Sequence, residues 1–188
     1  MDDAIDVIIG QWARTRPDVD VSPMGVAGRV SRASRLLERG AREFLTGHGL
    51  EAWEFDMLAT LLRNGDDATM CMKDMSTAGM VSPGALTNRM DHLVKRGLVT
   101  RGQAPGNRRK TLVSLTEEGR RVVDDVLERH AANEDRLLAG LSPTDREALS
   151  ALLRKLLVSL GDTPASCGDA PGPRESPTLA ASRPPRSR

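Results

Sequence analysis

Apolar residues recur at helical spacing in a short segment near the middle of the chain. One face of this segment carries Leu86, Met90, Leu93 and Leu98. The opposite face is small and polar, and it carries Gly84, Asn88, Asp91 and Lys95. Ser82 is a favourable N-cap, and Pro83 suits the first helical turn because its missing N–H would have no partner there. The pattern predicts a helix that begins after Ser82 and ends at Gly97.

Two short apolar segments follow this helix. Residues 98–100 and 111–115 are rich in β-branched and aliphatic side chains, which favours a pair of strands. Between them the sequence QAPGNRRK places a Pro-Gly turn shortly before three cations. A helix with a small polar outer face can insert into one groove of DNA, and a basic two-stranded hairpin that follows it can contact the next groove. Residues 82–115 therefore predict a DNA-binding unit.

Apolar stripes elsewhere predict a mostly α-helical chain, with this hairpin as a small β-wing. The predicted helices cover residues 3–15, 24–45, 51–63, a Met-rich stretch within 68–82, 116–139 and 143–160. The last two helices carry more apolar surface than a small DNA-binding unit can cover, which favours a dimer partner. From Gly161 onward Gly, Pro, Ser and Arg prevail, and such a composition does not form a core. We therefore predict a disordered tail.

These segments divide the chain into four parts. Residues 1–46 hold two N-terminal helices, an added helix and a helix that serves the dimer or a pocket. Residues 47–115 form the DNA-binding lobe, residues 116–161 the C-terminal dimerisation helices, and residues 162–188 the tail. A chain of 188 residues is long enough to bury a core in one domain with an appendage.

Positive charge is concentrated on the predicted helix and hairpin. Within residues 82–112 a single acid, Asp91, accompanies the cations Arg89, Lys95, Arg96, Arg101, Arg108, Arg109 and Lys110. The whole chain has a formal net charge of only +1. A nearly neutral protein with its cations gathered on one element has an electrostatic footprint for phosphates. The alternative is an ordinary solvated helix and hairpin, in which these charges serve solubility alone.

The composition argues against several other classes of protein. No apolar run approaches the ~20 residues of a membrane-spanning helix, and no secretion signal begins the chain, which predicts a cytoplasmic protein without a membrane partner. The two cysteines are too few for a disulfide framework, and the three histidines show no metal-ligand spacing. No nucleophile is arranged with a general base. We therefore expect no enzyme activity, no metal and no cofactor.

The order of the elements and one motif resemble the MarR-type (multiple antibiotic resistance regulator) winged-helix transcription factors. Their motif reads Asp-x-Arg, three residues, an aliphatic residue, any residue, and Leu-Thr-x-x-Gly. Here it runs through Asn107, Arg109, Val113, Leu115, Thr116 and Gly119, after the similar passage LVKRGLVTR. The resemblance spans about residues 25–160 and implies a winged helix-turn-helix with N- and C-terminal dimerisation helices. Asn107 replaces the usual Asp, and an amide offers only a neutral hydrogen bond to the wing arginine.

The resemblance implies a homodimeric, ligand-responsive repressor that binds a pseudo-palindromic operator in double-stranded DNA. The expected DNA contacts come from Ser82, Gly84, Thr87, Asn88, Lys95, Arg108, Arg109 and Lys110. Thr87 would touch a thymine methyl group, Asn88 would pair with adenine, and the two arginines would enter the minor groove. Two other classes stay open. One is a sequence-tolerant architectural DNA-binding protein without a ligand switch, and the other is a small-molecule-binding protein without DNA function, against which the cluster of cations argues.

A narrower resemblance, to the urate-responsive branch of the family, rests on the extra N-terminal helix and on the stretch QWARTRPDVDVSPMGVAGRVSR. It implies an effector pocket that contains Trp12, Asp56, Arg89 and Arg101. The implied effector is urate, another purine-derived anion or a tricarboxylate. Helical geometry also turns Arg89 toward the apolar face, where a cation needs a partner such as Asp56. These two residues form either part of the pocket or an ion pair that simply fixes the helix, and Trp12 is alternatively a core residue.

Overall fold

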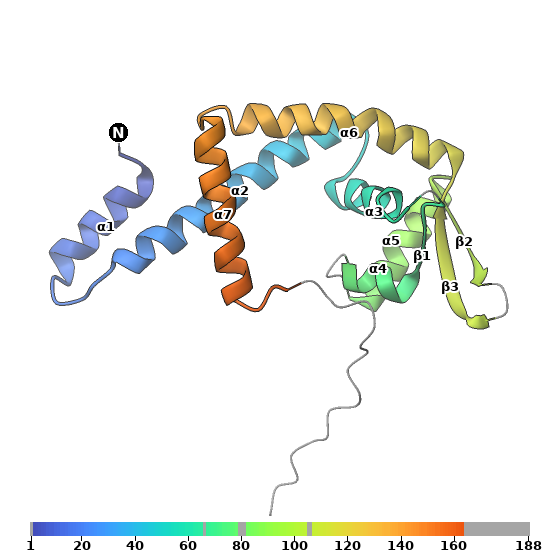
Figure 1. Cartoon of the computed structure of the whole chain (residues 1–188), viewed down its shortest axis with the longest axis horizontal. Helices are drawn as coiled ribbons and strands as arrows, with labels where there is room; N and C mark the ends of the chain where they lie inside the picture. Colours follow the sequence, from blue (N-terminus) through green and yellow to red (C-terminus); the bar gives the residue numbers. More distant parts are fainter. Residues whose placement is uncertain (1, 66, 79–81, 105–106, 164–188) are drawn as a thin grey trace, which may run out of the picture. The chain divides into compact units, whose positions relative to one another are not determined.

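The computed structural model describes residues 2–65, 67–78, 82–104 and 107–163, which form a mostly helical protein with one small antiparallel sheet (Figure 1). This confirms the predicted fold class. Contacts divide the chain into two units, residues 1–140 and 141–188, and each unit is described by itself. The predicted tail lies outside the described residues from position 164 onward. None of the described helices is long and apolar enough to cross a membrane.

The first unit begins with two helices that pack on each other, α1 (Ala4–Thr15) and α2 (Ser22–Gly47). Asp3 caps α1 by accepting the backbone N–H groups of Ile5 and Asp6. Arg29 of α2 binds the carboxylates of Asp3 and Asp6 at 2.8 and 2.6 Å, so charged contacts join the two helices. The helix α2 begins before the predicted residue 24 because Pro23 fits the first turn of a helix.

Residues 52–115 form a lobe that contributes most of the apolar core of this unit, to which α2 adds Leu45 and the long helix after the lobe adds Val123 and Val126. The lobe contains α3 (Ala52–Leu62), β1 (Thr69–Cys71), α4 (Met72–Ala78), α5 (Pro83–Lys95), β2 (Val99–Ala104) and β3 (Asn107–Leu115). Leu58 of α3, Leu86 of α5 and Val113 of β3 are at most 1% exposed and belong to one cluster. Because α5 buries its apolar stripe in this core, its small polar face points outward.

The sheet has the strand order β1-β3-β2, and both pairs are antiparallel. Thr69 of β1 pairs with Ser114 of β3, and Val99 of β2 pairs with Leu115 of β3. The short helix predicted within the Met-rich stretch is present as α4, and the strand β1, which was not predicted, precedes it. The strand forms by pairing with β3, where the partner of Thr69 lies 45 residues away in the sequence, and such pairing leaves no local signal.

A long helix, α6 (Glu117–Leu137), completes the first unit and packs against α2 and α3. Thr116 caps α6 by accepting the N–H of Gly119, and its own hydroxyl donates to the carbonyl of Gly97. At Gly119 the helix passes so close to the carbonyl of Leu98 that no side chain would fit. The second unit contains α7 (Pro143–Ser159), which Ser142 and Asp145 cap reciprocally.

Candidate nucleic-acid interface

The outer face of α5 is accessible along its length. Leu86, Met90 and Leu93 are buried, whereas Gly84, Asn88 and Lys95 are exposed together on the other side of the helix. Ser82 begins the helix by accepting the N–H of Ala85 at 3.4 Å. Thr87, next to Asn88, is half-buried. The helix residues that we expect to contact DNA therefore lie on or beside one small polar surface.

The hairpin of β2 and β3 carries the predicted run of cations at the start of β3. Asn107 and Lys110 are exposed, and the strand register is irregular between Gln103 and Ala104, next to the turn. The backbones of Arg108 and Arg109 belong to β3, and the side chains of both arginines lie outside the described part of the structure. The turn residues 105–106 also lie outside it. The hairpin backbone thus places residues 107–110 at the tip of the sheet.

Arg101 connects this hairpin to α5. Its guanidinium, on β2, donates to the carboxylate of Asp91 on α5 across 2.6 Å. Both side chains keep contact with solvent, so water and salt screen the ion pair. Arg101 is therefore held against the helix and is still accessible to a ligand from solution.

Arg89 lies over the ring of Trp53 on α3, with its guanidinium carbon 5.5 Å from the ring centroid. The geometry is that of a cation–π contact, in which the negative face of the indole attracts the cation. No ion pair joins Arg89 to Asp56, although the structure describes both side chains. The ion pair, which was one of the two alternatives for these residues, is therefore not formed in this subunit, and Arg89 contacts Trp53 instead.

Asp56 of α3 has a perturbed carboxyl group. The residue keeps contact with solvent, yet partial burial is the largest influence on the group and raises its pKa. The charges of His130, Arg63 and Arg89 act in the opposite direction and are weaker. Burial disfavours the charged form of Asp56, and cationic side chains lie around it. An anion that binds here would therefore meet positive charge.

Trp12 lies on α1 and is 41% exposed. The alternative prediction, that Trp12 is a core residue, does not hold in this subunit. The extensive contacts of α1 are with α2, and α1 has no comparable contact with α3 or α5. The structure therefore brings Arg89 close enough to Asp56 to influence its pKa, and it joins Arg101 to α5. It does not bring Trp12 to these three residues.

A second set of contacts between α3 and α5 was not predicted. The side chain of Glu54 is 2% exposed, accepts a hydrogen bond from Arg96 across 2.6 Å and lies 3.2 Å from Nε2 of His92. Arg96 also donates to the carbonyl of Gly49 at 3.1 Å. The available signal was the position of Glu54 at the third residue of α3, where it forms a capping box with Glu51. Nothing local in the sequence indicates that this acid is buried or which cations reach it.

Comparisons with known proteins agree with this arrangement of helix and hairpin. A model of the MarR family matches residues 48–110, which include α3, α5 and most of the hairpin. The HTH-type transcriptional regulator PecS of Dickeya dadantii is 37% identical over 149 residues, which cover 79% of this chain and 90% of PecS.

Two solved structures have similar folds. The chain is similar to AbsC, a MarR family transcriptional regulator from Streptomyces coelicolor, with a TM-score of 0.68 and 25% identity over 77% of this chain and 97% of AbsC. It is also similar to BpsR of Bordetella bronchiseptica, with a TM-score of 0.62 and 26% identity over 70% of this chain and 97% of BpsR. The BpsR structure concerns regulation of DNA binding by 6-hydroxynicotinic acid.

Proposed function

The chain belongs to the MarR family of transcriptional regulators, and from this premise we propose that it binds a pseudo-palindromic operator as a homodimer and releases it when a small organic anion binds. The observation that carries the proposal is the outer face of α5, which is small, polar and accessible beside a basic hairpin. Such a helix fits the major groove, where each base pair displays its own pattern of donors and acceptors.

On this proposal α5 is the recognition helix. Asn88 pairs with adenine and Thr87 contacts a thymine methyl group, which gives the protein its sequence preference. The other contacts go to phosphates or to the minor groove and position the protein without reading the sequence. They come from Ser82, Gly84, Lys95, Arg108, Arg109 and Lys110.

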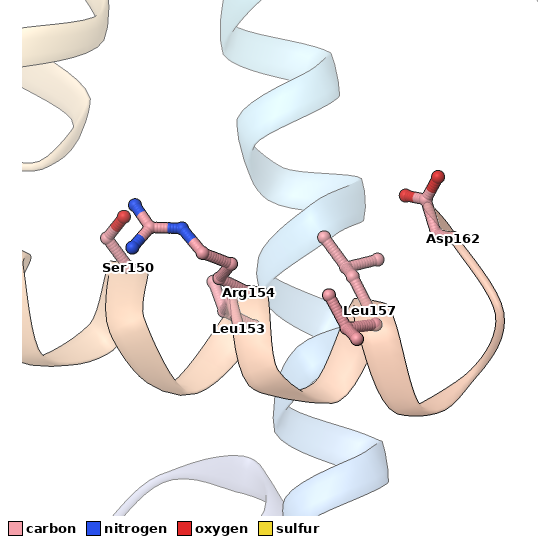
Figure 2. Close-up of a pocket in the computed structure, with 6 residues that line it drawn as sticks. Ser150, Leu153, Arg154, Leu157 and Asp162 are labelled. Carbon is pink, nitrogen blue, oxygen red and sulfur yellow. The ribbon is translucent and has the colours of Figure 1, made fainter. Parts of the chain in front are cut away.

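A second subunit would cover apolar side chains that α7 exposes. The side chains at least 37% exposed are Leu149, Leu152, Leu156, Leu157 and Val158 of α7 and Leu160, which follows the helix. Leu153 and Leu157 line a hollow on this unit, with Ser150, Arg154 and Asp162 at its edge (Figure 2). Apolar surface gathered in this way supports an interface between subunits. The two recognition helices would then lie ~34 Å apart, one turn of DNA.

The effector would bind where Arg89 and Arg101 supply positive charge beside α3, α5 and β2. Its negative oxygens would draw Arg89 away from Trp53, which pulls on the recognition helix, and would draw Arg101 away from Asp91, which removes the ion pair between this helix and β2. Urate, another purine-derived anion or a tricarboxylate has this chemistry, and the response of BpsR to 6-hydroxynicotinic acid supports a small organic acid. Trp12 would cover the ligand only if α1 moves or the partner subunit supplies this residue.

An experiment with two variants tests the DNA-binding part of the proposal. The wild-type protein first selects a duplex from a random-sequence pool. Asn88→Ala should then weaken binding to the selected duplex by about 1–3 kcal/mol and leave binding to random DNA nearly unchanged. Arg109→Ala should weaken binding to both duplexes and flatten the salt dependence, because it removes a charge that every sequence meets.

The same measurement distinguishes the proposed operator binding from the alternative function. Equal losses on both duplexes for Asn88→Ala would favour a sequence-tolerant architectural DNA-binding protein without a ligand switch. A wild-type protein that enriches no duplex would contradict the proposed operator binding.

A further inference from the structure

Glu54 is the one acidic or basic side chain that is buried among the described residues. Burying a carboxylate is costly unless charged partners and hydrogen bonds compensate for the lost water. One oxygen, Oε2, is fully engaged, because it accepts from the guanidinium of Arg96 at 2.6 Å and from the backbone N–H of Glu51 at 2.9 Å. Arg96 directly follows the last residue of α5, so this buried charge holds the end of the recognition helix against α3.

The other carboxylate oxygen, Oε1, is buried and accepts no hydrogen bond, although Nε2 of His92 lies only 3.2 Å away. A neutral imidazole offers this oxygen either a lone pair, which repels it, or a neutral N–H. An imidazolium offers a charged donor, which forms a shorter and stronger hydrogen bond. The side chain of His92 is 54% exposed and borders a hollow of 470 Å³ that Glu54 and Arg96 also line, so its proton exchanges with solvent.

These contacts lie along one side of the recognition helix. His92 and Arg96 are separated by one helical turn and both reach Glu54, and Arg89, almost one turn earlier, lies over the neighbouring Trp53. On another side of the helix, Asp91 is tied to Arg101 of the hairpin. The C-terminal half of α5 is therefore held from α3 and from β2, while Asn88 stays exposed.

We propose that Glu54 is a positioning residue for DNA binding, which holds the recognition helix through Arg96 and, when the imidazole is protonated, also through His92. This inference rests on the proposed DNA binding by α5. Histidine side chains change charge between about pH 5 and 8, so the contact with His92 strengthens as the pH falls and is lost as the pH rises. Hydrogen bonds to base edges depend on the orientation of the helix, and DNA affinity therefore rises with acidity through this contact.

Charged groups of both signs face His92. Glu54 and Glu51, both from the start of α3, line the same hollow. Arg96 also lines it, and its guanidinium donates to Glu54 and to the Gly49 carbonyl. Arg89 lies over the Trp53 ring, whose centroid is 5.5 Å from that of the His92 ring.

The test is a double-mutant cycle across pH. His92→Gln keeps a neutral N–H donor that does not titrate, and Glu54→Gln keeps the shape of the side chain without its charge. Dissociation constants for the selected duplex are measured at about pH 6 and about pH 8 and at constant ionic strength, for wild type, both single variants and the double variant. From high to low pH, wild type should gain about three- to tenfold in affinity relative to His92→Gln. In the Glu54→Gln background, the His92→Gln change should produce no such difference.

His48→Gln is the matched control. His48 lies at the end of α2, where its ring bonds to the carbonyl of Phe44, so its variant makes the same substitution away from Glu54 and should follow the wild-type pH profile. The proposal is overturned if His92→Gln follows that profile too, or if the effect of His92 persists without the charge of Glu54.

Thermal unfolding and duplex selection by wild type serve as two further measurements. His92 is half exposed, so His92→Gln should stay folded even if Glu54→Gln does not. Thermal unfolding of wild type and His92→Gln at both pH values then measures the contribution of the His92 contact without DNA. A wild-type protein that selects no duplex overturns the proposed function and the positioning role together. A wild-type protein that binds its duplex without a pH-dependent effect of His92 overturns the positioning role through His92 alone.

Discussion

Arg101 on β2 and Asp91 on α5 form an ion pair of 2.6 Å. The residue pair joins the two elements that we expect to contact DNA. Arg101 is also one of the two arginines of the proposed effector pocket, and Asp91 already binds it. An anion that binds Arg101 must therefore compete with Asp91, and the competition links the ligand directly to the position of α5.

The effector pocket predicts release of the selected duplex by a small anion. Urate, xanthine, citrate and aconitate are titrated against the complex of wild type, Arg89→Ala and Asp56→Ala. An effector with a coupling free energy of about 1–3 kcal/mol would weaken DNA binding roughly 5–150-fold, provided that it binds the DNA-free form better. If none of the anions releases DNA, or if both variants respond as wild type does, these residues do not form the sensor.

Asp91→Asn refines this prediction. The substitution leaves Arg101 in place and removes its competitor, so the effective anion should bind up to about fivefold more tightly, since an exposed ion pair contributes at most about 1 kcal/mol. Quenching of the intrinsic fluorescence of Trp12 and Trp53 measures the affinity without DNA. Arg101→Ala is the control and should lose affinity. An unchanged affinity in Asp91→Asn would mean that Arg101 does not meet the ligand.

Gly119→Ala should destabilise the protein by about 3 kcal/mol, because a methyl group there would overlap the backbone carbonyl of Leu98 and neither segment can yield easily. Gly40→Ala is the matched control. Its methyl group would come within 2.7 Å of the Leu137 side chain, whose flexible end can rotate, and alanine favours the helix. Urea unfolding should therefore show a large loss for Gly119→Ala and a change within about 1 kcal/mol for Gly40→Ala. Similar values for both would contradict the close approach of α6 to Leu98.

The raised pKa of Asp56 predicts a dependence of stability on pH. Because burial raises the pKa in the folded protein, the folded state binds the proton more tightly than the unfolded state, and the free energy of unfolding falls as the pH rises above the usual carboxyl range. Asp56→Asn removes this pH-dependent loss of stability, so the variant should be at least as stable as wild type at neutral pH. Its free energy of unfolding in urea should also change less with pH on the acid side of neutrality.

Asp3→Asn provides the opposite control. The hydrogen bond from Arg29 lowers the pKa of Asp3, so this carboxylate contributes stability above the usual carboxyl range and loses it as the pH falls through its lowered pKa. Asparagine still caps α1, and the variant should lose only the charged contact with Arg29 at neutral pH. Loss of stability at neutral pH in Asp56→Asn as well would show that the Asp56 carboxylate has a charged partner.

Local patterns were sufficient for the recognition helix and its hairpin. The N-cap Ser82, the stripe from Leu86 to Leu93 and the glycine at 97 all act within a few residues, so periodicity and capping predicted α5 correctly. The strand β1 escaped prediction because it exists only by pairing with residues near Ser114. Such pairing leaves no signal in the three residues themselves.

The candidate site was harder to predict because its contacts join distant segments. Helical geometry indicated that Arg89 leans inward and needs a partner, and that inference agrees with its place over Trp53. Asp56 was the expected partner because it offers a charge, whereas the partner in the structure is the aromatic ring of Trp53, three residues earlier in α3. Glu54 was missed since a capping acid is usually solvated, and only the fold brings Arg96 to it from 42 residues away.

The exposed apolar side chains of α7 predict that the protein dimerises through this helix. Leu157 lines the hollow in Figure 2 and is 47% exposed, so an aspartate there would cost the subunit little and would place an unpaired charge in the proposed interface. Leu157→Asp, and more severely Leu153→Asp, should sediment as monomers at concentrations where wild type is a dimer. Lys155→Asp changes the charge at an exposed polar position of the same helix and should remain dimeric. A well-folded Leu157→Asp dimer, judged by helical circular dichroism and sedimentation together, would place the subunit interface elsewhere.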